Sequence, residues 1–128
     1  MSARTVVIVG AGLAGSRCAD TLRSEGFDGR NVLVGDEPSP PYERPALSKA
    51  YLSGEKSEIG LRPHSHWAER GIELELGRRV RRLDVSRRTY DGGPRADALV
   101  LATGADARTF PGPAAAGMHT LRTAADAD

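Results

Sequence analysis

The feature that most constrains the fold of this 128-residue chain is a strongly apolar run followed directly by closely spaced glycines. The run Thr5–Val9 is β-branched without polar alternation, which predicts a parallel strand buried on both faces. The glycine-rich sequence GAGLAG follows at residues 10–15, and a helical pattern then continues to about Glu25. A second apolar run, Asn31–Gly35, is followed by two acids. This order predicts a complete βαβ unit.

The glycine spacing has a specific physical use. Gly10 permits a tight turn after the strand, Gly12 lets the backbone approach a pyrophosphate, and Gly15 lets helix and strand pack closely. The helix then directs its first N–H groups and the positive end of its dipole at the phosphates. Asp36 or Glu37 supplies the acid expected for ribose hydroxyls. The alternative is a glycine-rich helix cap without a nucleotide, but the flanking strand, helix and acid favour the dinucleotide.

The remaining elements are predicted to be short. The first helix should bury Ala14, Cys18 and Leu22, which are spaced four residues apart. Residues 38–45 carry four prolines and are not expected to form regular structure. Further helices are predicted at Ala46–Leu52 and Pro63–Arg70, and further strands at Ile72–Leu76 and Ala98–Ala102. Short strands are also expected around Val80, Leu83, Val85 and Tyr90, turning at residues 91–93. The terminal residues Thr123–Asp128 are small or acidic, and neither a helix cap nor a closing strand is expected there.

Composition indicates one globular domain. The chain is 39% hydrophobic and 27% charged, with a formal net charge of +1, so no strong field toward nucleic acid or an anionic membrane is expected. No apolar run approaches the roughly 20 residues of a membrane span. The single cysteine, Cys18, excludes an internal disulfide and a CxxC pair, and is expected to be a small core residue. An apolar strand begins within four residues of the N-terminus, which leaves no room for a signal sequence and predicts a cytoplasmic protein.

Four other groups of polar residues are candidates for a functional role. The stiff segment Pro40–Lys49 suits a cofactor lid, in which Arg44 meets a phosphate and Lys49 places a charge near a cofactor ring, although a solvated surface loop is an equal alternative. His64 and His66 fall on different faces of a helix and lack a third ligand, so no metal site is expected. His119 stands alone and is expected to be solvated. The arginines between residues 78 and 88 suit either steering of an acidic partner or, more simply, a solvated strand edge.

Four segments carry a family resemblance: TVVIVGAGLAGSRCADTLR, VLVGDEPSPPYERPALSKAYLSG, LRPHSHWAERGIELELGRRVRRLD and LVLATGADAR. They resemble the ferredoxin-reductase branch of the pyridine nucleotide-disulfide oxidoreductase superfamily, whose members serve Rieske-type dioxygenases and bacterial P450 systems. Apoptosis-inducing factor and rubredoxin reductase are similar. The resemblance covers essentially the whole chain, and PYERPALSK with ATG is more specific than the glycines. The disulfide branch has a CxxxxC pair after the second strand, where this chain has PYERPALSK, so dithiol chemistry is excluded.

The resemblance implies an α/β fold: a Rossmann-like FAD-binding domain with a central parallel sheet and a small antiparallel β-meander, incomplete because the C-terminal part is absent. Residues 1–122 correspond to the N-terminal portion of that FAD-binding domain, and residues 123–128 to the start of a linker toward an NAD(P)H-binding domain. Family chains continue with that second domain, a return to the FAD domain and a C-terminal interface domain. The chain is therefore expected to be a truncated sequence, a gene fragment or an isolated N-terminal piece.

The resemblance also implies roles for individual residues. The FAD pyrophosphate is expected to be lined by Gly10, Gly12, Leu13, Ala14 and Gly15. Asp36, alone or together with Glu37, is expected to hold the adenosine ribose, and Val80 to pack the adenine through its backbone. Arg44 is expected near the phosphate and ribityl region, and Lys49 beside the isoalloxazine as the residue nearest the reacting ring. The remaining cofactor-binding residues are expected to be Ala102, Thr103, Gly104 and Arg122.

The resemblance implies that the complete protein takes a hydride from NADH or NADPH onto FAD and passes electrons singly to a [2Fe–2S] ferredoxin. The alternatives are a fragment of a related flavoprotein, such as a rubredoxin reductase or a nitrite reductase flavin subunit, or a non-catalytic fragment. The chain alone is predicted to bind FAD weakly and to have no reductase activity.

Overall fold

The computed structural model describes residues 4–91 and 93–128 of the chain, which form two compact units. The first unit contains the residues up to Tyr42 together with Leu61–Gly104. The second contains Glu43–Gly60 and Ala105–Asp128. Among the described residues, none of the helices has the length and apolar character needed to cross a membrane.

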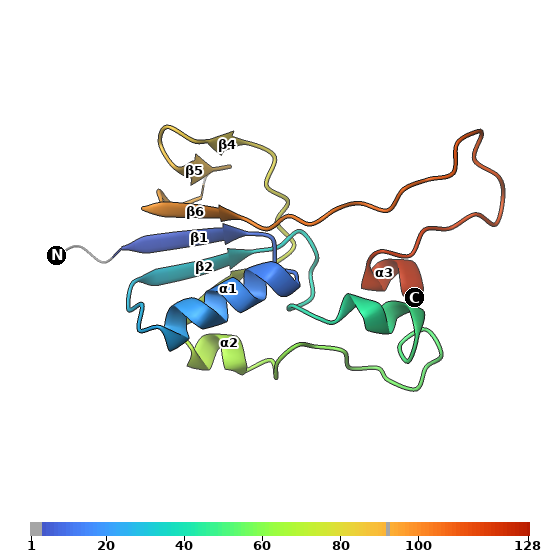
Figure 1. Cartoon of the computed structure of the whole chain (residues 1–128), viewed down its shortest axis with the longest axis horizontal. Coiled ribbons are helices and arrows are strands. Elements are labelled where there is room, and N and C mark those ends of the chain that lie inside the picture. Colours follow the sequence, from blue (N-terminus) through green and yellow to red (C-terminus); the bar gives the residue numbers. More distant parts are fainter. Residues whose placement is uncertain (1–3, 92) are drawn as a thin grey trace. The chain divides into compact units, whose positions relative to one another are not determined.

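A four-stranded parallel sheet forms the centre of the first unit. Its strands are β1 (Thr5–Val9), β2 (Arg30–Val34), β3 (Ile72–Glu75) and β6 (Ala98–Leu101), arranged in the order β3-β2-β1-β6. Figure 1 shows β2, β1 and β6 side by side. In β1 and β2 the apolar residues are buried on both faces, as their unbroken β-branched sequence predicts. In the edge strand β3, Ile72 is buried and Glu73 is exposed, which matches the predicted alternation.

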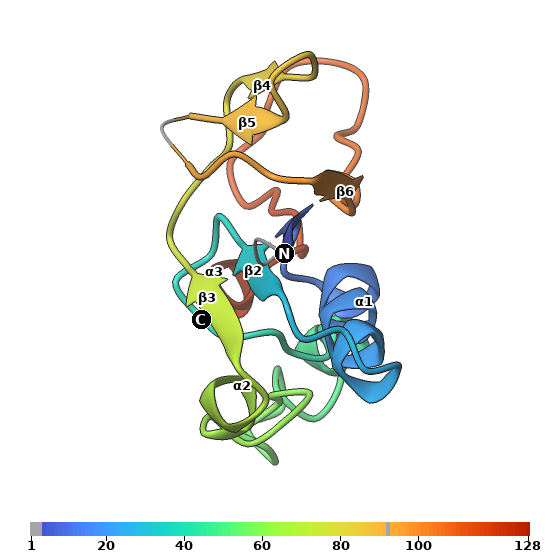
Figure 2. The ribbon, with the colours of Figure 1, turned by 90° about the vertical axis from the view of Figure 1, so that its left-hand side faces the viewer.

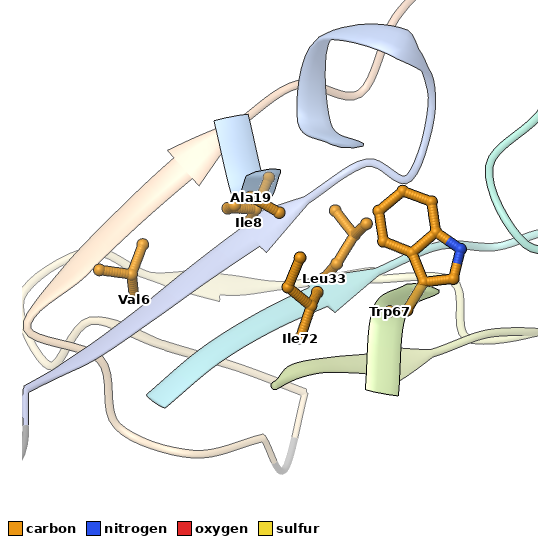
Figure 3. Close-up of a cluster of buried hydrophobic side chains, with 6 residues drawn as sticks. All are labelled: Val6, Ile8, Ala19, Leu33, Trp67 and Ile72. Atoms are coloured by element: carbon orange, nitrogen blue, oxygen red, sulfur yellow. The ribbon is translucent and has the colours of Figure 1, made fainter. Parts of the chain in front are cut away.

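Two helices cover one face of this sheet. They are α1 (Leu13–Ser24) and the short α2 (His66–Glu69), which is only part of the predicted Pro63–Arg70. Figure 3 shows Ala19 of α1 beside Ile8, with Trp67 of α2 close to Leu33. The buried cluster on this face consists of Val6, Ile8, Ala19, Leu33, Trp67 and Ile72.

The buried face of α1 differs from the predicted one. Ala14 is exposed, whereas Gly15 and Ala19 are buried and Leu22 packs partly buried against the cluster. The reason is the close approach at Gly15, which turns the line Gly15, Ala19, Leu22 toward the sheet and leaves Ala14 one position off that line. Cys18, predicted to be a core residue, packs against the same cluster but is only partly buried.

A small antiparallel hairpin covers the opposite face. It consists of β4 (Leu83–Asp84) and β5 (Thr89–Tyr90), seen in Figure 2 on the side of the sheet away from α1. Its Tyr90 joins a second buried cluster, made up of Val7, Val9, Val32, Val34, Tyr90 and Ala96. The predicted small antiparallel element is thereby confirmed as a pair of strands.

The details of this hairpin correct the sequence prediction. Val80 and Val85 lie outside the strands: Val80 packs partly buried against the second cluster, and Val85 is 80% exposed in the turn. The chain reverses between β4 and β5, because the Asp84 carboxylate accepts hydrogen bonds from the Ser86 hydroxyl and the Arg87 backbone N–H. A second turn follows, in which the N–H of Gly93 donates to the carbonyl of Tyr90. The predicted turn residue Gly92 lies outside the described residues.

The second unit contains a 3-10 helix, Arg44–Ser48, and a terminal helix α3, Ala124–Ala127. The 3-10 helix has a proline in its first turn and begins two residues before the start of the short helix predicted at Ala46–Leu52. The expectation of an uncapped terminus is wrong. Thr123 caps α3 in a capping box, in which its hydroxyl accepts from the Asp126 N–H and the Asp126 carboxylate accepts from the Thr123 N–H.

Candidate functional site

The glycine turn between β1 and α1 is fixed by contacts that leave no room for a side chain. Gly10 has a φ of +117°, and its N–H donates to the carbonyl of Val34 at 2.8 Å. A Cβ atom at Gly10 would lie 2.0 Å from the carbonyl oxygen of Ala102. The turn is therefore held between the carboxyl ends of β2 and β6, and two predicted site residues, Gly10 and Ala102, lie in direct contact.

The start of α1 lies close against this turn. A Cβ atom at Gly15 would come within 1.8 Å of the carbonyl oxygen of Gly10. Both glycines are thus required by packing alone, whether or not a ligand is present. Their positions agree with the roles predicted for the first and third glycines of the motif.

Gly12 behaves differently from its two neighbours in the motif. It is the N-cap of α1, and a Cβ atom built on it would meet no protein atom within 4 Å. No side chain caps the helix, its first turn carries no acid, and Leu13 and Ala14 are exposed. The first N–H groups and the positive end of the helix dipole are therefore accessible to an anion. The residues present fit a pyrophosphate, which needs this bare backbone approach.

The two candidate acids follow immediately after β2. A Cβ atom at Gly35 would lie 2.6 Å from the Cβ of Ala11, so the end of β2 lies against the glycine turn. The Asp36 side chain is 56% exposed, and its Oδ2 lies 3.5 Å from Nη1 of Arg79. The Glu37 Oε2 atom accepts a hydrogen bond of 2.5 Å from the phenol of Tyr42. The structure thus brings both acids to the edge where the turn lies, but in different surroundings.

Other predicted residues of the first unit lie at or beside this edge. Thr103 and Gly104 are exposed and directly follow Ala102 after β6. Val80 lies on the sheet face opposite α1, since it packs against the second cluster. The segment leading to it is tied to the end of β2, because the N–H of Arg78 donates to the carbonyl of Gly35 at 2.8 Å.

Three predicted residues belong to the second unit. Nη1 of Arg44 donates to the carbonyl oxygen of Arg122 at 2.7 Å, which brings these two residues together. Lys49 is exposed at the C-cap of the 3-10 helix, and its Nζ lies 3.3 Å from the carbonyl of Pro45 and 3.4 Å from the hydroxyl of Ser48. The 3-10 helix therefore positions Arg44 and Lys49 at its two ends.

Sequence reasoning missed two interactions of the first unit. The phenol of Tyr42 was not given a role, although it lies inside the PYERPALSK segment. The pair between Asp20 of α1 and His66 of α2, with 2.6 Å between Oδ1 and Nε2, was also missed, because its partners are 46 positions apart and no local pattern relates them. Arg62 adds a second contact to Asp20 at 3.3 Å. Among the described residues, no group of three or more His, Cys, Asp or Glu side chains is placed to hold a metal.

The parallel sheet, the glycine turn and the helix starting at Gly12 define an α/β protein of the Rossmann type. The sequence of residues 4–128 matches the family described as pyridine nucleotide-disulphide oxidoreductase, and the chain belongs to that family. Its sequence lacks the cysteine pair that the word disulphide in the family name implies, because Cys18 is its only cysteine.

Individual relatives narrow this placement. The chain is 46% identical over 129 residues to the ferredoxin–NAD(+) reductase component of a biphenyl dioxygenase system from Paraburkholderia xenovorans, covering 95% of this chain and 32% of that protein. It is 42% identical to rhodocoxin reductase of Rhodococcus erythropolis, covering 97% of this chain and 31% of that protein. The reductase in the covalent putidaredoxin reductase–putidaredoxin complex superimposes with a TM-score of 0.88 at 38% identity, over 97% of this chain and 32% of that chain. The chain therefore spans about a third of the length of the relatives it matches.

Proposed function

We propose that this chain is the FAD-binding portion of an NAD(P)H-dependent ferredoxin reductase that serves an oxygenase system. The observation that carries the proposal is the 46% identity, over 92–95% of this chain, to the ferredoxin reductase components of a biphenyl and a chlorobenzene dioxygenase. The bare backbone at Gly12 supports it physically, because a pyrophosphate has an open approach to the start of α1 there.

The residues of the first unit are proposed to hold the nucleotide half of FAD. Gly10, Gly12 and the first turn of α1, Leu13 to Gly15, bind the pyrophosphate through backbone N–H groups. An acid at the end of β2 accepts hydrogen bonds from the adenosine ribose, and the backbone at Val80 packs the adenine. Ala102, Thr103 and Gly104 form the backbone edge along which the cofactor lies.

The residues of the second unit are proposed to act on the remaining part of the cofactor. Arg44 contacts the phosphate and ribityl region, with Arg122 beside it. Lys49 lies by the isoalloxazine and is the residue nearest the reacting ring, where a positive charge favours a reduced, anionic ring. Bound FAD supplies the change from a two-electron hydride donor to a one-electron acceptor, so none of these side chains needs to act as a nucleophile.

The partners of the complete protein follow from the same proposal. NADH or NADPH is the hydride donor and a [2Fe–2S] ferredoxin is the acceptor, with the cytoplasm as the site of the reaction. Ferredoxin is preferred over rubredoxin or a nitrite reductase partner, because two relatives that are 46% identical to this chain are named as ferredoxin reductases of dioxygenases.

Visible absorption of the purified chain, after mixing with FAD and desalting, tests the proposal. A flavin band that survives desalting, or a saturable quenching of FAD fluorescence if the complex is too weak to survive it, is expected. The matched control is Gly12→Ala, whose added methyl group occupies the pyrophosphate approach. Equal behaviour of FAD with both proteins, with no saturable binding to either, would contradict the proposal.

A further inference from the structure

The hairpin formed by β4 and β5, on the side of the sheet away from α1, lies in a stretch with many arginines (Figure 2). This stretch, residues 78–91 and 93–95, carries seven arginines and two aspartates, whereas the whole chain has a net charge of only +1. We name it the basic hairpin and infer that it is a docking surface for an acidic segment of a partner protein. The inference goes beyond the proposed function and does not depend on cofactor binding.

The arginines do not protect a strand edge, which is the simpler interpretation of them. β4 consists of Leu83–Asp84 and β5 of Thr89–Tyr90, so neither strand contains an arginine. Charges that protect an edge strand lie within that strand. The seven arginines lie instead before β4, in the turn, or after β5: Arg78, Arg79, Arg81, Arg82, Arg87, Arg88 and Arg95. Edge protection therefore does not account for them.

The two aspartates of the basic hairpin are engaged by its own backbone. The Asp84 carboxylate accepts a hydrogen bond from the Arg87 N–H at 2.9 Å. The Asp91 carboxylate accepts from the backbone N–H groups of Arg81 and Arg82. Both carboxylates thus bind main-chain groups, and they neutralise the arginine side chains only in part.

Most of the guanidinium groups are available to an external anion. Three of the seven form an ion pair with a described residue: Arg78 with Glu75, Arg79 with Asp36 and Arg87 with Asp84. The other four form no ion pair with any residue that the structure describes, and all four are exposed: Arg81, Arg82, Arg88 and Arg95. A guanidinium group presents a planar set of N–H donors that matches a carboxylate. These four can therefore bind the acids of a partner.

Backbone contacts bring two of these arginines together in the turn region. The N–H of Ala96 donates to the carbonyl of Arg88 at 2.9 Å, which places Arg95 next to Arg88 in the fold. Arg88 itself has a φ of +52°, a conformation that residues other than glycine adopt uncommonly. The same turn contains Val85, which is 80% exposed. Exposed arginines together with an exposed apolar side chain are typical of a protein interface, in which arginine is enriched.

A protein is favoured over a nucleic acid as the partner. Tyr90 is the sole aromatic residue in the sequence of the basic hairpin and is 2% exposed, so bases find no side chain there on which to stack. Val85 gains nothing from a phosphate, but it can pack against an apolar side chain located among carboxylates. The occupant is thus an acidic protein segment that carries an apolar residue among its acids.

Fluorescence anisotropy of the purified chain with a labelled peptide tests the inference. The peptide consists of glutamates around one central leucine, and a matched probe has serine in place of that leucine. The leucine peptide is expected to bind at about 10 mM salt and about tenfold more weakly at about 150 mM, because salt screens pairs between exposed charges. The serine peptide should bind more weakly than the leucine peptide. Absence of saturable binding at the lower salt, or equal binding of the two peptides, would overturn the inference.

Two double variants locate the binding surface. Arg88→Gln combined with Arg95→Gln should weaken binding of the leucine peptide about tenfold. The control, Arg17→Gln combined with Arg108→Gln, removes two exposed arginines elsewhere and should weaken it less than about twofold. Equal losses in the two double variants would mean that the peptide senses only the overall charge, and the assigned surface would be wrong.

Val85→Ser separates a specific contact from a loss of folding. It should weaken binding of the leucine peptide and leave the serine peptide unchanged, a difference that an unfolded variant could not produce. Equal losses with both peptides would contradict the apolar contact. A single-stranded oligonucleotide with the same charge as the peptide serves as the competitor. Displacement of the leucine peptide by an equal or lower concentration of this oligonucleotide would refute the choice of a protein partner.

Discussion

Gly10 and Ala102 are so close that a single added methyl group would place two atoms 2.0 Å apart, the new Cβ of residue 10 and the carbonyl oxygen of Ala102. The atom in contact is a backbone oxygen just after β6, and it cannot move aside as the end of a flexible side chain could. The glycine turn is therefore part of the sheet's own packing, and its requirement for glycine does not depend on a ligand.

Gly10→Ala is accordingly expected to cost about 3 kcal/mol or more of unfolding free energy, from both the clash and the positive φ. Urea denaturation followed by circular dichroism measures the loss. Gly26→Ala is the matched control, since Gly26 also has a positive φ, +83°, but open space around its Cβ position. That variant should lose only about 1 kcal/mol. Equal losses in the two variants would show that the clash with Ala102 is relieved at no cost.

Gly12→Ala should weaken FAD binding without destabilising the fold. Its φ of −86° suits alanine and the added Cβ meets nothing in the protein, so stability should stay within about 1 kcal/mol of wild type. FAD binding should weaken by about tenfold or more, because the methyl group occupies the backbone approach of the pyrophosphate. Fluorescence titration with FAD measures this. Unchanged affinity would place the pyrophosphate elsewhere.

Asp20→Asn should reduce stability in a pH-dependent way. Burial by itself raises the pKa of Asp20, but hydrogen bonds from His66 and Arg62 outweigh it, and the pKa of the folded protein is lowered. A lowered pKa gives stability that is fully present above the usual aspartate value of about 3.9 and is lost as the pH falls through the folded value. The variant should thus be less stable by about 1 kcal/mol at neutral pH, and the difference should shrink below about pH 4. A difference that stays constant down to pH 2 would contradict this.

Tyr90→Phe should change how the free energy of unfolding decreases at alkaline pH. Burial and the hydrogen bond to Glu75, 2.8 Å long, raise the pKa of the Tyr90 phenol. A raised pKa means that the stabilisation is present below the usual tyrosine value near 10 and is lost as the pH rises above it. Wild type should therefore lose stability more steeply than the variant above about pH 10. At neutral pH the variant should be less stable by only about 1 kcal/mol, because Glu75 loses the phenol but keeps the hydrogen bond that Arg78 donates to it.

Arg23→Lys tests a bridge between α1 and the loops beside it. The Arg23 guanidinium donates to four backbone carbonyls, those of Phe27, Gly29, Arg70 and Gly71. Lysine keeps the charge but cannot reach these acceptors with one ammonium group, so a loss of about 2 kcal/mol is expected in thermal or urea unfolding. Arg17→Lys, at an exposed position of the same helix, should be nearly neutral. Similar losses in both variants would indicate that α1 merely disfavours lysine.

The βαβ unit was predictable because its signals are local and agree with one another. The apolar strands, the glycine spacing and the helix each follow from residues within a few positions, and the parallel sheet contains them as expected. The face of α1 was less predictable. Ala14 and Gly15 are both small, and only the contact between Gly15 and the Gly10 carbonyl decides which of them is buried.

Two errors had signals that were present in the sequence but went unused. Asp84 followed two residues later by Ser86 is a typical side-chain-capped turn, and it reverses the hairpin before the more conspicuous residues 91–93 are reached. Thr123 followed by Asp126 has the spacing of a capping box, with aspartate in the place of glutamate. The Asp20–His66 pair had no such signal, because only the folded sheet brings α1 and α2 together.

The order of the strands in the sheet has a consequence for synthesis on the ribosome. The central strand β1 pairs with β6 on one side, and Thr5 and Asp97, which are hydrogen-bonded at this junction, are 92 positions apart. At a translation rate of roughly 5–20 residues per second, β6 is synthesised several seconds after β1 has emerged. During that interval the nascent segment presents one unpaired edge of a β-branched strand, the kind of surface on which aggregates form. Slow translation downstream of Val34 should therefore lower the yield of folded chain more than slow translation beyond Gly104.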